Sequence, residues 1–140
     1  MTRWKKKNKY LLESQLGLKK DSLQFVQGVF FAPSFSTKTV PQLQRLFMGD
    51  ACHLNFGKYT LFTCYGVTAN ANMSPVAFGI VFGNENKERW ERFWSFVKRQ
   101  HPCLNDPKVT IITDQQKGSI EAMQQLLPHA VNFFCSYHHT

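Results

Sequence analysis

Two short apolar runs that each end in a single aspartate constrain the fold of this 140-residue chain more than any other feature. They are LFMGD at residues 46–50 and KVTIITD at residues 108–114. Runs this short and this apolar are typical of strands buried on both faces, which usually lie parallel inside a sheet. If the two strands are parallel neighbours, their C-terminal ends meet at one edge of the sheet. Asp50 and Asp114 would then converge at that edge.

Four further segments predict the rest of a mixed sheet. LQFVQGVFFAP (23–33) is rich in Phe and Val and predicts an opening strand, and AVNFFCSYHHT (130–140) predicts a closing one. KYTLFTCYGVTAN (58–70) and SPVAFGIVFG (74–83) flank a turn-prone ANAN and predict a β-hairpin. SFSTKTVPQLQRL (34–46) predicts a loop or a short helix.

Two segments have the 3.6-residue period of a helix. In the first, four large apolar side chains fall at i, i+3, i+4 and i+7 on one face: Trp90, Phe93, Trp94 and Val97. In the second, SIEAMQQLLP, Ser119 can cap the helix and Pro128 ends it. A hairpin followed by alternating helices and strands predicts an α/β fold with a mixed sheet and helices packed on it. The chain length suits one domain.

The positive charge of the chain is local. The net charge is +8, but the first 20 residues hold seven of the 17 basic side chains and one of the nine acidic ones. We interpret residues 1–21 as a basic arm suited to phosphate contact or nuclear import, with a solvated start that binds nothing as the alternative. No apolar run approaches the roughly 20 residues of a membrane span. Four widely spaced cysteines and no export signal favour reduced thiols in an intracellular protein.

Two carboxylates brought together at strand ends repel each other, which raises the pKa of one of them unless a cation lies between. Hard oxygen ligands favour Mg²⁺ or Mn²⁺, and two such ions can stabilise both the attacking and the leaving oxygen in phosphodiester chemistry. The alternative is that Asp50 and Asp114 are turn residues or helix caps, which is common after a strand.

Several motifs occur in the order found in a known transposase family. An aspartate follows the first core strand in GDACHLN, and a hairpin returns through SPVAFG to a glutamate and a tryptophan-bearing helix. TIITDQQKGS then leads into an alanine-containing helix that ends in LLPHA, and C-x-x-H follows in CSYHH. Over about residues 24–140, these motifs together resemble the transposase domain of Mutator-like elements, which has a ribonuclease-H-like fold.

The resemblance implies a site, a cofactor and partners. Asp50 matches the first catalytic carboxylate of the family and Asp114 the second, which implies a two-ion Mg²⁺ or Mn²⁺ site. The implied partner is DNA, both transposon ends and target, and the full transposase would be nuclear and could be a homo-oligomer. Residues 22–140 would form the transposase domain, incomplete at its C-terminus.

The third acidic residue of the family is a Glu on a downstream helix, and it has no counterpart before Thr140. We therefore expect this chain alone neither to cleave nor to join DNA. One alternative is a self-contained ribonuclease-H-like nuclease in which Glu85 is the third ligand, although an acid near a helix start can simply favour the helix dipole. The other is a domesticated relative that binds DNA or regulates transcription without catalysis.

C-x-x-H at Cys135 and His138 is half of a tetrahedral zinc site. Within the chain the candidate further ligands are His139, Cys52 and His53, but we expect the partners to lie in the C-terminal part of the domain that this sequence lacks. The alternative is a buried cysteine and a surface histidine without metal.

Overall fold

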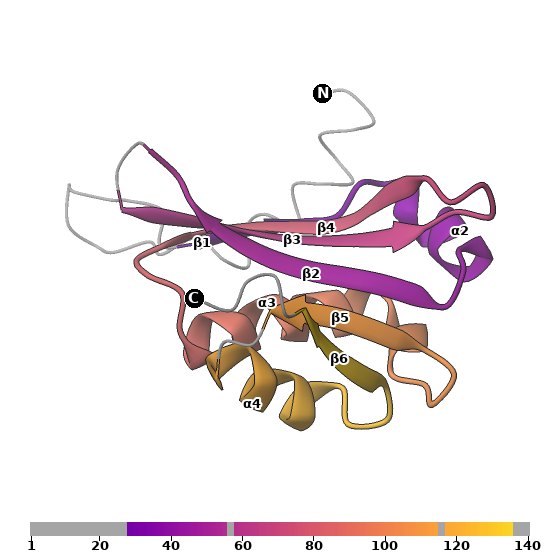
Figure 1. The fold of residues 1–140 in the computed structure, drawn as a ribbon. Helices are drawn as coiled ribbons and strands as arrows, with labels where there is room; N and C mark the ends of the chain where they lie inside the picture. The colour runs from indigo at the N-terminus through magenta and orange to yellow at the C-terminus, as the bar shows by residue number, and fades with distance from the viewer. Residues whose placement is uncertain (1–27, 56–57, 115–116, 136–140) are drawn as a thin grey trace.

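The structure is a computed structural model that describes residues 28–55, 58–114 and 117–135 (Figure 1). The predicted basic arm, the first part of the predicted opening strand and His138 lie outside the described residues.

The described residues form one six-stranded mixed sheet with the order β1-β4-β3-β2-β5-β6. β1, β4, β3 and β2 pair antiparallel, and β2, β5 and β6 pair parallel. The strands are β1 Gly28–Phe31, β2 Leu46–His53, β3 Tyr59–Val67, β4 Met73–Phe82, β5 Thr110–Asp114 and β6 Val131–Cys135. The predicted α/β class and the predicted hairpin, β3 and β4, are confirmed. This arrangement is compatible with a ribonuclease-H-like fold.

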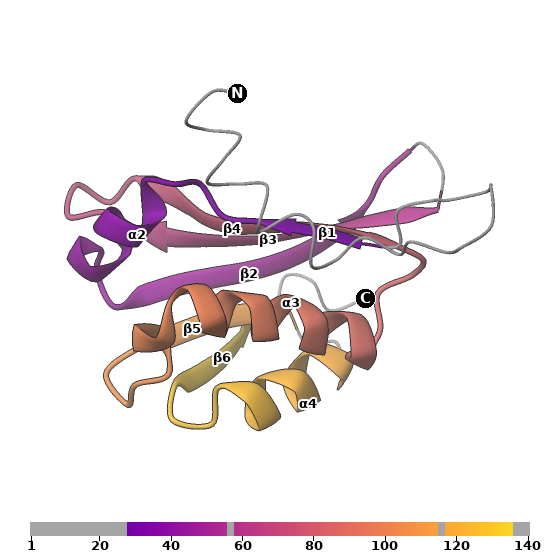
Figure 2. The ribbon, with the colours of Figure 1, turned by 180° about the vertical axis from the view of Figure 1, so that it is seen from behind.

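Two long helices lie on the same face of the sheet, the face turned toward the viewer in Figure 2. They are α3 Lys87–Gln100 and α4 Lys117–Leu126. A short helix, α2 Ser36–Thr39, and a 3₁₀ turn, Val40–Gln42, connect β1 to β2, and a second 3₁₀ turn, Pro102–Leu104, follows α3. The side chain of Asn86 caps α3 by accepting a hydrogen bond from the backbone N–H of Arg89 at 2.9 Å.

The core between α3 and the sheet is aromatic, as the helical period of α3 predicts. Trp90, Phe93 and Trp94 have no exposed surface. Phe62 of β3 meets the Trp90 ring edge-on with a centroid distance of 4.7 Å, and Phe30 of β1 stacks on Phe96 at 5.8 Å. Aromatic contacts therefore hold α3 under the antiparallel half of the sheet.

The structure corrects two details of the predicted elements around Asp50. β2 does not end at Asp50 but continues to His53, because it stays paired with β3 through Asp50↔Thr63 and His53↔Thr60. Nor is β2 buried on both faces: Phe47 is buried, whereas Met48 is half-buried and Asp50 is exposed.

Ser119 does not cap the second long helix. α4 begins at Lys117, so Ser119 lies in its first turn, where it is buried. At Gly118 the start of α4 packs closely against the start of α3. A Cβ on this residue would lie 2.6 Å from the backbone nitrogen of Lys87 in α3. Close packing of the two helix starts, rather than a cap, accounts for this glycine.

Candidate functional site

The pairing of β2 with β5 places the two predicted aspartates at matching positions. The parallel ladder runs from Leu46↔Thr110 to Met48↔Ile112. Asp50 and Asp114 each lie two residues beyond that last pair. Because side chains alternate along a strand, both aspartates belong to the same face of the sheet as Met48 and Ile112. The predicted parallel neighbourhood of these two strands is thus confirmed, although β2 continues past Asp50.

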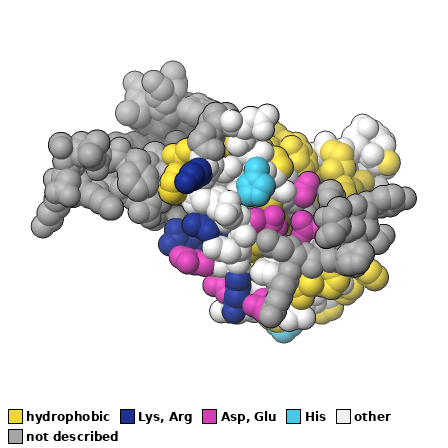
Figure 3. All heavy atoms as spheres, turned by 60° about the vertical axis from the view of Figure 1, so that its left-hand side comes forward, with side chains coloured by type: hydrophobic (Ala, Val, Ile, Leu, Met, Phe, Trp, Pro, Cys, Tyr) yellow, Lys and Arg dark blue, Asp and Glu magenta, His cyan; other side chains and the backbone are white. Residues whose placement is uncertain are grey.

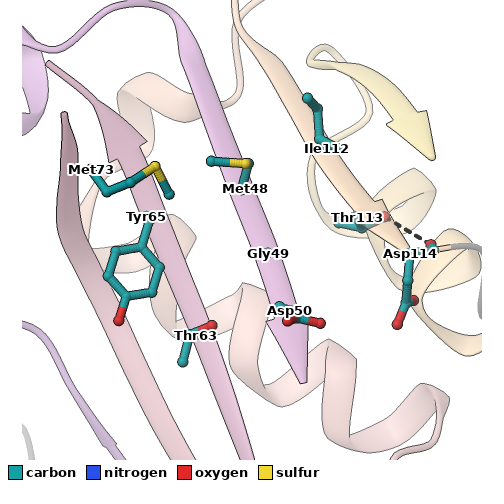
Figure 4. A pocket seen from close by; sticks show the side chains of 9 residues that line it. All are labelled: Met48, Gly49, Asp50, Thr63, Tyr65, Met73, Ile112, Thr113 and Asp114. Atoms are coloured by element: carbon teal, nitrogen blue, oxygen red, sulfur yellow. Dashed lines mark hydrogen bonds between the residues drawn. The ribbon is translucent and has the colours of Figure 1, made fainter. Parts of the chain in front are cut away.

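Asp50 and Asp114 line one open pocket of about 230 Å³. Figure 4 shows both carboxylates at one end of it and apolar side chains at the other. The lining residues are Met48, Gly49, Asp50, Thr63, Tyr65, Met73, Ile112, Thr113 and Asp114. The pocket therefore combines two anionic groups and three hydroxyl-bearing side chains with an apolar wall.

Each aspartate takes part in a hydrogen bond with its neighbour in the same strand. The Asp50 carboxylate accepts a hydrogen bond from the backbone N–H of Ala51 at 2.9 Å. The Thr113 hydroxyl donates to the backbone carbonyl of Asp114 at 3.3 Å. Asp50 is exposed and Asp114 is half-buried, so both carboxylates can be reached from solvent.

Glu85 is a third carboxylate in the neighbourhood of these two. It lies in the link between β4 and α3, one residue before the N-cap, so it is not part of the first helical turn. The indole N–H of Trp90 donates to its Oε1 at 2.9 Å.

The pKa of Glu85 is raised above its ordinary value first by burial, an effect that the Trp90 hydrogen bond partly offsets. The charges of Asp114 and Asp50 raise this pKa further. Glu85 therefore lies near enough to both aspartates for their charges to act on it, whereas the charge of His53 lowers its pKa.

The oxygen ligands Asp50, Asp114 and Glu85 suit a hard cation, but their carboxylates are not clustered around one position. Within residues 28–55, 58–114 and 117–135, no three Asp, Glu, His or Cys side chains are grouped closely enough to form a ready metal cluster. Asp50, Asp114 and Glu85 nevertheless offer oxygen ligands only, which Mg²⁺ and Mn²⁺ prefer. The pKa of Glu85 is raised chiefly by burial, and the charges of Asp114 and Asp50 contribute less.

Charged side chains of both signs are interspersed on the face seen in Figure 3. Two cations of α3 are paired: Lys87 lies 3.7 Å from both Glu91 and Glu121, and Arg92 lies 3.0 Å from Glu88. These pairs mean that the start of α3 is not a purely basic surface for DNA.

Of the two predicted zinc ligands, Cys135 and His138, the structure describes the position of Cys135 in the fold. Cys135 ends β6 and pairs in register with Asp114, while His138 is outside the described residues. Cys52 and His53 are exposed near the end of β2. None of the described helices has the length and apolar character that a membrane crossing demands.

Comparison with known proteins identifies the family. A search of curated proteins found no match. A family model described as the MULE transposase domain matches residues 50–140, a range that starts at Asp50 and includes Glu85 and Asp114. This range covers more than half of the chain, and its strand order is compatible with the fold that the motifs implied. The chain therefore belongs to the transposase family of Mutator-like elements.

Proposed function

We propose that this domain is the catalytic module of a Mutator-like DNA transposase, which cleaves DNA at the element ends and transfers the strand to a target. The observation that carries the proposal is the register match of Asp50 and Asp114 on neighbouring parallel strands, inside the range matched by the family. A role in the nucleus, where such a transposase meets its DNA, belongs to the same proposal.

Asp50 and Asp114 would hold the divalent ions. Bound Mg²⁺ or Mn²⁺ supplies activation of water and stabilisation of charge on the leaving oxygen. Binding and orienting the DNA phosphate would fall to side chains of the protein. Thr63 and Tyr65 line the same pocket and carry hydroxyls that can donate hydrogen bonds to phosphate oxygens.

The test is Mn²⁺ binding followed by electron paramagnetic resonance, together with nicking of duplex DNA. We expect Asp50→Asn and Asp114→Asn to lose most Mn²⁺ binding, because each removes one charged ligand. Asp106→Asn is the matched control: its carboxylate accepts from the backbone N–H of Lys108 at 2.8 Å, in the turn before β5, and does not line the pocket. Unchanged Mn²⁺ binding in both Asp50 and Asp114 variants would refute the proposed site.

The coupling of Glu85 to both aspartates favours one second candidate, a self-contained nuclease that uses Asp50, Glu85 and Asp114. Nicking by this 140-residue chain that is lost in both Asp50→Asn and Glu85→Gln would favour this candidate over a transposase whose third acid lies elsewhere. A domesticated DNA-binding relative would show DNA binding without metal binding that depends on the aspartates.

A further inference from the structure

Two rows of side chains cross β3, β2 and β5 on the pocket side of the sheet. The acid row is Thr63, Asp50 and Asp114, and the apolar row is Tyr65, Met48 and Ile112. On each strand the two rows are two residues apart, a separation of about 7 Å. A Cβ on Gly49, between the rows, would meet Trp94 of α3, so both rows lie on the face of the sheet away from that helix.

The apolar row is open to solvent through the same pocket as the acids. Tyr65, Met48 and Ile112 are half-buried, and Met73 at the start of β4 extends the row with half of its surface exposed. Figure 4 shows Met48 and Met73 at the end of the pocket away from the carboxylates, with the Tyr65 ring extending from that end along β3. The metal chemistry proposed above gives this apolar surface no task.

Tyr65 presents a fixed aromatic ring to the pocket. Phe78 meets it edge-on, with a centroid distance of 5.8 Å and an interplanar angle of 89°, so the contact fixes the ring without stacking on it. Tyr59, earlier on β3, provides a comparison: Phe82 meets its ring edge-on at 5.5 Å, but Tyr59 does not line the pocket. The two tyrosines are therefore packed alike and differ in whether they face the pocket.

We propose that the apolar row binds the unpaired base of a nucleotide whose phosphate lies at the acid row. This inference rests on the proposed function, since it takes the phosphate to be held at Asp50 and Asp114. A nucleotide carries its phosphate and its base on one sugar, which bridges rows about 7 Å apart. Aromatic rings and methionine thioethers suit the flat face of a base, and stacking of this kind tolerates every base.

The size of the pocket favours a single base. Its volume of about 230 Å³ is below the roughly 300–1,000 Å³ of pockets that enclose a drug-sized molecule, so it suits about one ring system. In duplex DNA each base is stacked and paired and does not reach such a pocket. The base must therefore be single-stranded already, or be drawn out of the helix when the DNA binds.

Methionine methyl groups report occupancy of the apolar row without requiring activity. In protein labelled with ¹³C at these methyls, a single strand of five thymidine nucleotides, added in Ca²⁺, should move the resonances of Met48 and Met73. Met123 of α4 is fully buried in the core, so its resonance is the internal control and should stay in place. A deoxyribose phosphate strand of the same length without bases should move Met48 and Met73 much less, because it lacks the group that the row binds.

The ratio of the dissociation constants for the abasic strand and the thymidine strand isolates the contribution of the base. In the wild type we expect the thymidine strand to bind about 10-fold more tightly, as one stacked base would provide. Tyr65→Leu should reduce this ratio to near one, whereas Tyr65→Phe keeps the ring and should keep the ratio. Tyr59→Leu is the matched control and should also keep it, because that ring has the same edge-on packing outside the pocket.

Three results would overturn the inference. The first is equal movement of Met48 and Met73 with both strands, a comparison that decides the question even if Tyr65→Leu does not fold. The second is an unchanged ratio in Tyr65→Leu. The third is movement of the same methyl resonances with protein concentration in the absence of DNA, which would show that a second copy of the chain covers the row. In each case, Mn²⁺ binding that depends on Asp50 and Asp114 would leave the proposed function standing.

Discussion

A single methyl group added at Gly49 should destabilise the domain by about 3 kcal/mol, the upper end of the range for overpacking a core. A Cβ at this position would lie 2.5 Å from Cζ2 and 2.9 Å from Cη2 of Trp94, whereas ordinary contacts lie at 3.4–4 Å. The Trp94 ring cannot swing away, because Trp90 stacks on it and Phe93 meets it edge-on at 5.3 Å. In Gly49→Ala, β2 or α3 must therefore shift by about 1 Å, which the surrounding core resists.

The same geometry predicts a compensating pair. Trp94→Phe removes the outer ring atoms that the new methyl group meets, and alone it should destabilise the domain by about 2 kcal/mol through the cavity it leaves. In the double variant the methyl group occupies part of that cavity, so we expect a favourable coupling energy of about 1–2 kcal/mol.

The assay is urea unfolding followed by far-ultraviolet circular dichroism, since the substitution alters tryptophan fluorescence. Gly28→Ala is the control, because a Cβ there would meet Val81 at an ordinary 3.7 Å and should change stability by less than about 0.5 kcal/mol. Additive effects of Gly49→Ala and Trp94→Phe, within about 0.5 kcal/mol, would refute the argument from steric overlap.

Three further predictions concern stability and pH. In metal-free protein, Glu85→Gln should stabilise the fold at pH 7 by about 0.5 kcal/mol, because burial, Asp114 and Asp50 raise the pKa of this half-exposed carboxyl. The gain in stability should vanish below pH 4.5, where the carboxyl is protonated in both the folded and the unfolded state. Urea unfolding in the presence of a chelator that shows no gain at pH 7 would contradict this prediction. Burial lowers the pKa of His101 below 6.5. The stability contributed by its neutral form is therefore present above pH 6.5 and is lost as the pH falls through the folded pKa. In thermal melts, the melting temperature of His101→Asn should decline less between pH 7.5 and pH 5 than that of the wild type. Ala71 has φ = 64°, a left-handed conformation that glycine adopts without strain, so Ala71→Gly should raise the free energy of unfolding by about 0.5–1 kcal/mol, and a decrease would refute this.

The spacing of apolar residues along the sequence predicted those helices and strands that have one buried and one exposed face. The helical spacing of Trp90, Phe93 and Trp94 placed all three in the core, and they are fully buried. The apolar runs before Asp50 and Asp114 predicted parallel neighbours, and this is how β2 and β5 lie. These predictions succeed because burial of apolar surface dominates the choice of face and of neighbour.

Details that depend on tertiary pairing could not be predicted in the same way. The continuation of β2 past Asp50 comes from its ladder with β3, and the close approach of Gly118 to the start of α3 is a contact between two helices. The link between Glu85 and Trp90 crosses the helix cap at a spacing of five residues, which matches neither the helix nor the strand period. Of these three acids, only Asp50 and Asp114 were evident from the local pattern, as the last residues of two apolar runs.

The ladder between β2 and β5 contains three residue pairs, from Leu46↔Thr110 to Met48↔Ile112, and it is the seam between an antiparallel and a parallel half-sheet. Asp50 belongs to one half and Asp114 to the other, so the separation of the two carboxylates depends on how the halves are rotated about this short seam. Because aromatic side chains of α3 support the first half, and Trp94 packs against Gly49 next to Asp50, a change in that packing would reach the site as a change of angle. The spacing of the acids is thus adjustable in evolution without altering any residue of the pocket.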